Sequence, residues 1–185
     1  MNEHVEIEYK ILITKEILED LLKRYPHYKE YSQTNFYFLS DELSKRLWSL
    51  RIRYKDDQYE MTLKRPIKNH RLETNIIISS IDKELLLNGQ YVDNEITRIL
   101  KEEHIDLSSL DTSHSLTTHR YDIEENEGIL SLDISEYNGI IDYELEYEVE
   151  NEEEGFKRFL EIIKPYHLKY TKNCKSKTQR VLESL

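Results

Sequence analysis

Val5-Glu6-Ile7-Glu8-Tyr9-Lys10-Ile11 alternates strictly between apolar and charged residues. Successive side chains of a β-strand point to opposite sides, so this stretch predicts a strand with one apolar face and one charged face. The same alternation returns in five later segments, at residues 50–55, 59–64, 118–122, 131–133 and 143–149. The chain is therefore expected to be built mainly from half-polar strands.

Other segments carry apolar residues at helical spacing or carry helix caps. Thr14 can cap a helix that runs to Arg24, and Pro26 follows it. We expect further helices at 41–45, 79–87, 152–164 and 176–182, and one that begins at Asn94. Strands are expected at 5–11, 33–39, 47–55, 58–65, 71–78, 116–124, 128–136 and 140–150. About eight strands with mostly antiparallel pairing indicate an α+β fold.

Composition limits the classes of function. The chain has 185 residues, with 37 acidic and 26 basic side chains and a net charge of −11. Such an acidic chain lacks the basic face that holds nucleic acid or anionic membranes, so neither partner is expected. Cys174 is the single cysteine, which excludes an internal disulfide and suits a reducing cytoplasm. We expect one cytoplasmic domain that spans residues 1–185.

The charged strand faces are sorted by sign. Acids dominate the first and last expected strands, whereas bases dominate the third, fourth and sixth. Each charged face taken alone is explained by exposure to water, because antiparallel sheets allow one wet face. The amphipathic helices, however, need the apolar faces to cover. We therefore predict a closed eight-stranded antiparallel barrel with helices packed outside and a charged lumen.

A lumen with an acidic wall and a basic wall suits a polyanion that carries a divalent metal. Eight strands leave room for one small ligand. Mg²⁺ takes one or two carboxylates and completes its shell with water and phosphate oxygens. Glu6 and Glu8 stand roughly 7 Å apart along one face of the strand. Arg51 and Arg53 can bind phosphate oxygens through two parallel hydrogen bonds.

These residues resemble a known family. Glu6-x-Glu8-x-Lys10 is similar to the ExExK signature of the CYTH superfamily, the triphosphate tunnel metalloenzymes. Further matches follow in the family's order and cover nearly the whole chain, at residues 50–53, 62–66, 71–73, 117–121, 132–133 and 143–146. The set most resembles the small stand-alone CYTH proteins of bacilli and related bacteria.

The resemblance implies an eight-stranded tunnel that binds a triphosphate and Mg²⁺ or Mn²⁺. Glu6, Glu8, Glu144 and Glu146 would hold metal. Asp133 and Glu73 would either bind metal or orient the basic side chains. Phosphate would be bound by Lys10, Arg51, Arg53, Lys64 and Arg120, and also by Lys177 and Arg180 near the C-terminus. The catalytic set would be Glu6, Glu8, Lys10, Glu146 and Tyr37.

One segment departs from the family pattern. Residues 33–39 read Gln-Thr-Asn-Phe-Tyr-Phe-Leu, without the acid expected there. Gln33, Asn35 and Tyr37 share one face of this strand and are candidates for the lumen. Tyr37 with Lys10 resembles a tyrosine–lysine pair thought to shape the catalytic site in some members.

Three functions remain open at this point. The first is a divalent-metal-dependent hydrolase of a small-molecule triphosphate, with inorganic triphosphate ahead of thiamine or nucleoside triphosphates. The second is a module that binds polyphosphate or a phosphorylated nucleotide without turnover. The third is a class IV-type adenylyl cyclase. The protein would act as a monomer or homodimer.

Overall fold

The computed structural model describes residues 2–185, and its chain divides into two compact units. The first unit comprises residues 2–5, 33–116 and 180–185, and the second comprises residues 6–32 and 117–179. That residues 1–185 form a single domain stays a prediction.

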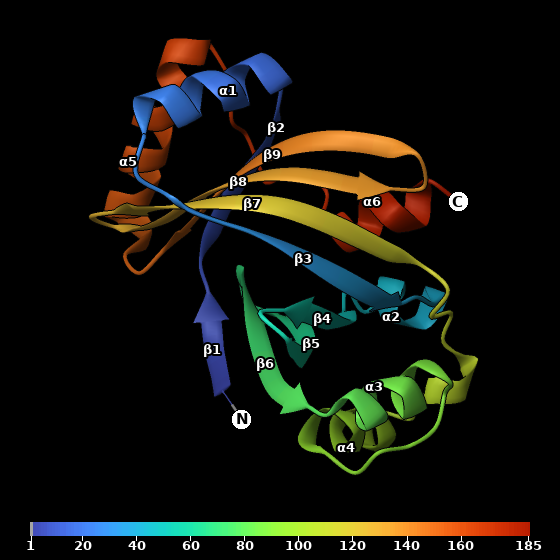
Figure 1. Ribbon diagram of the computed structural model, residues 1–185. Coiled ribbons are helices and arrows are strands. Elements are labelled where there is room, and N and C mark those ends of the chain that lie inside the picture. The colour runs from blue at the N-terminus through green and yellow to red at the C-terminus, as the bar shows by residue number, and fades with distance from the viewer. Residues whose placement is uncertain (1) are drawn as a thin grey trace. The chain divides into compact units, whose positions relative to one another are not determined.

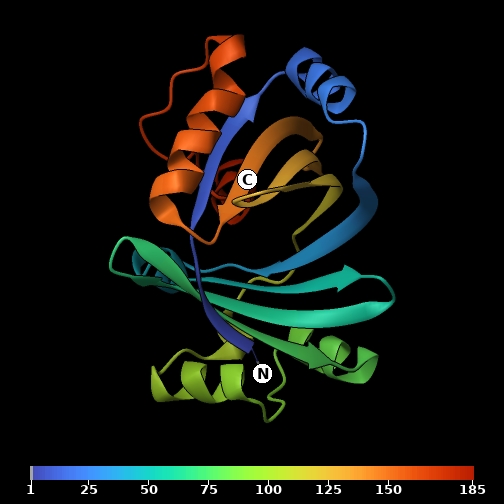
Figure 2. The same cartoon turned by 90° about the vertical axis from the view of Figure 1, so that its left-hand side faces the viewer.

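The first unit is an antiparallel sheet with helices on one face. Its strands run in the order β1 (Asn2–Glu6), β6 (His70–Ile78), β5 (Gln58–Ile67), β4 (Ser49–Lys55) and the later part of β3 (Lys29–Phe38). Helices α3 (Ser80–Leu87) and α4 (Glu95–Glu102) lie against the sheet in both views (Figures 1 and 2). The unit also contains α2 (Asp41–Lys45) and the 3₁₀ helix η1 (Leu107–Ser109).

The core of the first unit lies between these layers. Leu50, Ile52, Met61 and Leu63 are fully buried on β4 and β5 and cluster with apolar residues of α3 and α4. Because side chains alternate along a strand, Arg51 and Arg53 then occupy the opposite face. The helices therefore cover the apolar face, as the sequence predicts.

The second unit repeats this arrangement. Its strands run in the order β7 (Ser115–Glu125), β8 (Gly128–Tyr137), β9 (Ile140–Val149) and β2 (Glu8–Ile13). Helices α1 (Lys15–Arg24) and α5 (Glu152–Ile163) cover the apolar face (Figure 1). The chain continues through the 3₁₀ helix η2 (Lys164–Tyr166) to α6 (Lys177–Glu183), which passes from the second unit into the first.

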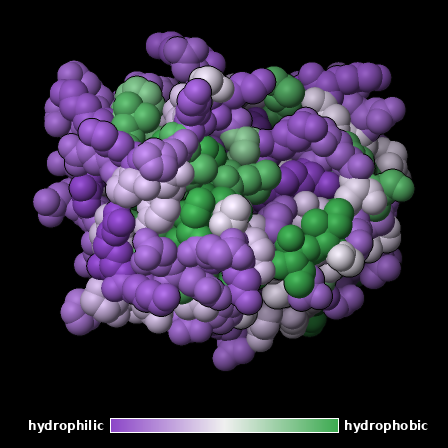
Figure 3. All heavy atoms as spheres, turned by 90° about the horizontal axis from the view of Figure 1, so that it is seen from above, coloured by the Kyte–Doolittle hydropathy of each residue, from purple (hydrophilic) through white to green (hydrophobic). Residues whose placement is uncertain are grey.

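One face of the molecule is mainly hydrophilic. Figure 3 looks at the molecule from above the view of Figure 1, and on this face hydrophilic residues surround a smaller hydrophobic area. None of the helices in residues 2–185 is long and apolar enough to cross a membrane.

The helices agree closely with the sequence prediction, but two strands differ. The first expected strand is divided at Ile7 into β1, which pairs with β6, and β2, which pairs with β9. β3 begins at Lys29, before the predicted start at Gln33. There are thus nine strands in residues 2–185, and hydrogen bonds do not close their order, whose ends are β1 and β2. β1 and β2 follow each other along the chain, with Ile7 between them.

The first residue of β8 must be glycine. Gly128 has a φ of +157°, and a Cβ added there would lie 1.9 Å from the carbonyl oxygen of Glu148 on β9. Gly139, in the next hairpin turn, has a φ of +76° with open space around its Cβ position. Gly128 is therefore required by close backbone packing, and Gly139 by backbone conformation alone.

Candidate functional site

The register of the second unit gathers charged side chains on one face of its sheet. Lys10 on β2 lies opposite Glu146 on β9, and Glu144 lies opposite Asp133 on β8. Asp133 in turn lies opposite Arg120 on β7. Since directly opposed residues project to the same side, residues from four strands form one polar cluster.

An acidic triad forms the centre of this cluster. Carboxylate oxygens of Asp133, Glu144 and Glu146 all lie within 4.8 Å of one another. Asp133 and Glu144 are fully buried. Buried carboxylates so close together repel each other unless a cation lies among them.

Lys177, at the start of α6, supplies that positive charge. Its Nζ lies 2.6 Å from Glu146 Oε1 and 2.8 Å from Asp133 Oδ2, and it donates a further hydrogen bond to Glu144. Burial alone would lower the pKa of Lys177, but the three carboxylates outweigh it and raise the pKa well above its usual value. The ammonium group therefore contacts all three carboxylates of the triad in this structure.

Arg120 holds the triad from β7. Its Nε and Nη2 donate to the two oxygens of Asp133 at 2.7 and 2.6 Å, and Nη2 also donates to Glu146. Burial would raise the pKa of Glu146, but Lys177 and Arg120 hold it well below its usual range. Glu146 is consequently ionised, as a metal ligand must be.

Lys10 and Glu8 flank the triad on β2 and form an ion pair with each other. Burial works to lower the pKa of Lys10, whereas Glu8, Glu146 and Glu144 together raise it above its usual value. Glu6, the other acid of the ExExK pattern, is buried at the end of β1. The break at Ile7 thus places the two glutamates on different strands.

The segment before α6 follows the edge of β2. The Asn173 side chain accepts a hydrogen bond from the Lys10 backbone N–H at 2.8 Å and donates one to the Glu8 carbonyl at 2.9 Å. The Cys174 backbone N–H donates to the Lys10 carbonyl, and its thiol contacts Glu144 Oε2 at 3.2 Å. These contacts anchor the residues that carry Lys177 into the triad. The sequence gives no periodic signal for them, because they lie in an irregular segment.

The first unit has its own charged face, on β4, β5 and β6. Lys64 Nζ lies 2.7 Å from Glu73 Oε2. Burial would raise the pKa of Glu73, but Lys64 and Arg51 overcome this effect and lower it to about 2. Arg53 Nε donates to Asn35 Oδ1 at 3.1 Å. Glu73 is therefore paired with Lys64 in this structure, and its two expected roles, as a metal ligand or as an acid that orients basic side chains, stay predictions.

The predicted site residues thus form two sets. The second unit brings together Glu8, Lys10, Arg120, Asp133, Glu144, Glu146 and Lys177. The first unit holds Tyr37, Arg51, Arg53, Lys64 and Glu73, with Tyr37 buried opposite Arg51. Arg180 is buried on α6. The Tyr37–Lys10 pairing and the lumen between the two charged faces stay predictions.

The donor set of the triad fits a hard divalent cation. Mg²⁺ and Mn²⁺ prefer carboxylate oxygens, and Asp133, Glu144 and Glu146 supply them from two neighbouring strands. Lys177 would have to leave the triad for such an ion to enter, because its ammonium contacts all three carboxylates. Metal binding by the triad therefore requires the Lys177 side chain to move.

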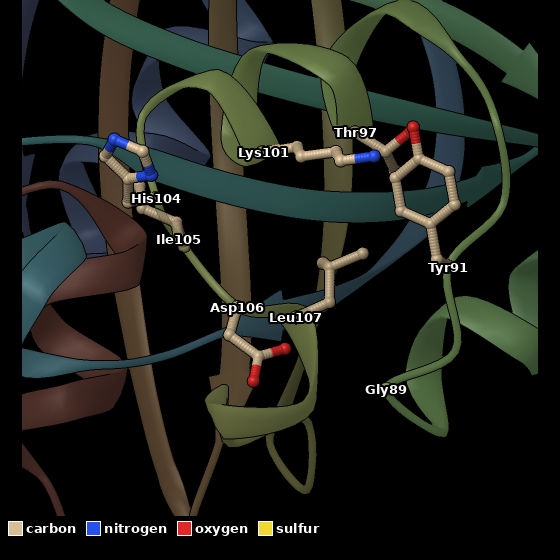
Figure 4. A pocket seen from close by; sticks show the side chains of 8 residues that line it. All are labelled: Gly89, Tyr91, Thr97, Lys101, His104, Ile105, Asp106 and Leu107. Atoms are coloured by element: carbon tan, nitrogen blue, oxygen red, sulfur yellow. The ribbon is translucent and has the colours of Figure 1, made fainter.

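A separate hollow of about 370 Å³ lies beside α4 and η1 in the first unit (Figure 4). Lys101 points toward Tyr91, with its ammonium 5.6 Å from the centre of the ring. His104 and Asp106 line the other side. The hollow contains none of the predicted site residues.

Comparisons with known proteins agree with the fold and the motifs. The CYTH domain model matches residues 4–180. The chain is 30% identical over 179 residues to "Putative triphosphatase YjbK" of Bacillus subtilis, covering 94% of this chain and 93% of that protein.

Solved structures show the same likeness. A "putative adenylate cyclase" from Bacillus halodurans has a TM-score of 0.87 and 35% identity, with 97% of this chain and 98% of that chain covered. HpAC1 from Hippeastrum, described as a "putative adenylyl cyclase" with a dominant triphosphatase activity, has a TM-score of 0.79 and 22% identity, with 96% and 95% covered. At that identity the second likeness supports the fold alone. From the match to nearly its whole length, this chain belongs to the CYTH-domain family.

Proposed function

We propose that this protein is a divalent-metal-dependent triphosphate hydrolase, with inorganic triphosphate as its first substrate and thiamine or nucleoside triphosphates after it. The observation that carries the proposal is the buried triad of Asp133, Glu144 and Glu146, surrounded by Lys10, Arg120 and Lys177. Carboxylates for a metal and cations for phosphate oxygens lie within one cluster, which is the pairing that phosphoryl transfer needs.

The acids have distinct roles in this proposal. Asp133, Glu144 and Glu146 would hold Mg²⁺ or Mn²⁺, with Glu8 and Glu6 as the further candidates from the ExExK pattern. When bound, the metal supplies charge neutralisation at the phosphate oxygens. Arg120 holds Asp133 and Glu146 in place through its hydrogen bonds, and Lys177 and Arg120 together keep the pKa of Glu146 well below its usual range.

The basic residues bind and align the substrate. Lys177, once displaced from the triad, and Lys10 would each donate to phosphoryl oxygens. Arg51, Arg53 and Lys64, on the charged face of the first unit, stay predicted phosphate-binding residues. Water attacks the terminal phosphorus, the bond to the bridging oxygen breaks, and the water proton passes to solvent. Because the side chains form no covalent bond, catalysis rests on position and charge.

A phosphate-release assay tests the proposal. The protein is incubated with inorganic triphosphate, thiamine triphosphate, ATP or GTP, each with Mg²⁺, Mn²⁺ or EDTA. We expect metal-dependent release from inorganic triphosphate, and its loss in Glu146→Gln. Glu84→Gln is the matched control, because Glu84 is an exposed residue of α3. Absence of release from all four substrates would refute the hydrolase.

The same incubations separate the alternatives. The adenylyl cyclase deserves its own measurement, because the Bacillus halodurans relative carries that name at 35% identity. Mass spectrometry of the ATP reaction would then find cyclic AMP and pyrophosphate. Binding of inorganic triphosphate without release would instead identify a binding module.

A further inference from the structure

The first unit has a hollow that the proposed function does not use. It has a volume of about 370 Å³ and lies beside α4 and η1 (Figure 4). Ligand sites in proteins begin at roughly 300 Å³, so the hollow has room for one small molecule. Its lining residues all belong to the first unit, and they lie outside the charged strands of the sheet.

The floor of the hollow is apolar because α4 ends in a tight turn. The backbone N–H groups of Glu103, His104 and Ile105 donate to carbonyls of the last turn of α4 at 2.8 to 3.1 Å. His104 has a left-handed conformation with a φ of +60°, and the chain after it carries the buried side chains of Ile105 and Leu107. A ligand that fills the hollow therefore has to present apolar atoms to these two residues.

Lys101 supplies a positive charge at the rim. Its ammonium lies 5.6 Å from the centre of the Tyr91 ring and makes no ion pair or hydrogen bond within residues 2–185. The nearby carboxylate of Asp93 is already paired, because Arg98 donates to its two oxygens at 2.9 and 2.8 Å. The ring positions the ammonium by a cation–π contact and leaves its hydrogen-bond donors unused. Lys101 is thus positioned to bind an anion.

Asp106 limits how much negative charge the anion can carry. It lies on the other side of the hollow from Lys101 (Figure 4). Its oxygens accept the Ser108 hydroxyl at 2.8 Å and the Ser108 N–H at 3.0 Å, and these hydrogen bonds lower the pKa of Asp106. The ionised carboxylate repels a second negative charge on a ligand. A single charge near Lys101 with apolar atoms elsewhere fits this arrangement, whereas polyphosphate does not.

We propose that this hollow binds a small organic monoanion with an apolar body, such as an arylalkyl carboxylate. The carboxylate pairs with Lys101, and the apolar part lies on Ile105 and Leu107. His104, whose imidazole also lacks a hydrogen bond in the described part of the chain, supplies a second donor to the carboxylate. The site shares no residue with the acidic triad, so it stands or fails independently of the proposed function.

Nuclear magnetic resonance of the full chain in EDTA tests the site, with hydrocinnamate as the probe. We expect the methyl signals of Ile105 and Leu107 to shift with a dissociation constant of about 1 mM or below. Hydrocinnamyl alcohol has the same body without the charge and should bind at least tenfold more weakly. Saturating inorganic triphosphate should leave the hydrocinnamate affinity unchanged. Absence of the shifts, equal affinity for the alcohol, or displacement by triphosphate would each overturn the inference.

Two variants assign the charges. Lys101→Met removes the ammonium and keeps an unbranched apolar side chain, so it should abolish the preference for hydrocinnamate over the alcohol. Lys45→Met, at an exposed position of α2, is the control and should retain that preference. Benzylmalonate, which carries one more carboxylate than hydrocinnamate, should bind the wild type several-fold more weakly, and Asp106→Asn should narrow this difference. An unchanged preference in Lys101→Met, or equal binding of benzylmalonate and hydrocinnamate by the wild type, would contradict the proposal.

Discussion

At the scale of single residues, Lys177 and a metal compete for one place. The ammonium contacts all three carboxylates of the triad. Lys177→Met removes this competitor, so we expect Mn²⁺ to bind about tenfold more tightly in calorimetry. Without metal the same substitution removes the one ammonium that contacts all three buried carboxylates and leaves Arg120 as the cation paired with Asp133 and Glu146, so the free energy of unfolding should fall by about 3 kcal/mol in EDTA.

Lys172→Met is the control for Lys177, because Lys172 lies in the same segment but is exposed. It should change neither the Mn²⁺ affinity nor the stability in EDTA by a measurable amount. Weaker Mn²⁺ binding by Lys177→Met than by wild type would contradict the competition.

Glu73 predicts a pH dependence. Its pKa in the folded state is about 2, below the ordinary value of 4.5, because Lys64 and Arg51 overcome its burial. A lowered folded-state pKa stabilises the fold above about pH 4.5, and that contribution is lost as pH falls toward 2. The shift corresponds to about 3 kcal/mol at neutral pH.

Urea unfolding at pH 7 and pH 3 checks this dependence. Glu73→Gln should be clearly less stable than wild type at pH 7, and the difference should shrink by more than half at pH 3. Glu84→Gln provides the exposed comparison. If the difference in unfolding free energy between wild type and Glu73→Gln is the same at both pH values, the charge of Glu73 does not contribute to stability.

At the scale of elements, the two hairpin glycines should respond differently to alanine. At Gly128 the added methyl would lie 1.9 Å from a backbone oxygen of β9, so the strands must separate. At Gly139 only the positive φ is unfavourable. We expect Gly128→Ala to lower the free energy of unfolding by more than 3 kcal/mol and Gly139→Ala by about 1 kcal/mol. Urea titration measures both, and equal losses would contradict the close packing.

Most elements could be predicted from sequence because each carries a local signal. α1 has its cap at Thr14, and the residues of β4 and β5 alternate without interruption. The break at Ile7 has no such signal, because the alternation of residues 5–11 continues through it. The break arises because the two halves pair with different strands, β1 with β6 and β2 with β9. Local periodicity cannot encode such a change of partner.

For the candidate site, alternation specifies which strand residues share a face but not the contacts made by irregular segments. The strand faces identify Asp133, Glu144 and Glu146 as acids of one surface, because alternation and order determine what shares a face. The position of Lys177 among them depends on an irregular segment held by Asn173 and Cys174. The hydrogen bond between Asn35 and Arg53 likewise depends on side-chain geometry, which alternation alone does not specify.

At the scale of the whole molecule, the boundary between the units passes through regular structure. The chain changes unit between residues 5 and 6, 32 and 33, 116 and 117, and 179 and 180. These four points lie inside β1, β3, β7 and α6. Neither unit can lose its structure without breaking elements that continue into the other, so we expect a single unfolding transition and one domain in the thermodynamic sense.

Two natural probes test this cooperativity. Trp48, the single tryptophan, reports on the first unit through its fluorescence, and Cys174, the single cysteine, reports on the second through its reactivity with a thiol reagent. Both should give the same urea midpoint. Separate midpoints would show two independent domains.

The contacts of Asn173 have a consequence for how copies of this protein meet one another. β2 ends the strand order, and the terminal strand of a sheet can recruit a strand from another molecule. Here one side-chain amide imitates a peptide group and occupies both the N–H of Lys10 and the carbonyl of Glu8. Proteolytic removal of the residues after Lys172 would expose the backbone edge of β2. The shortened protein should then form aggregates rich in intermolecular β-structure.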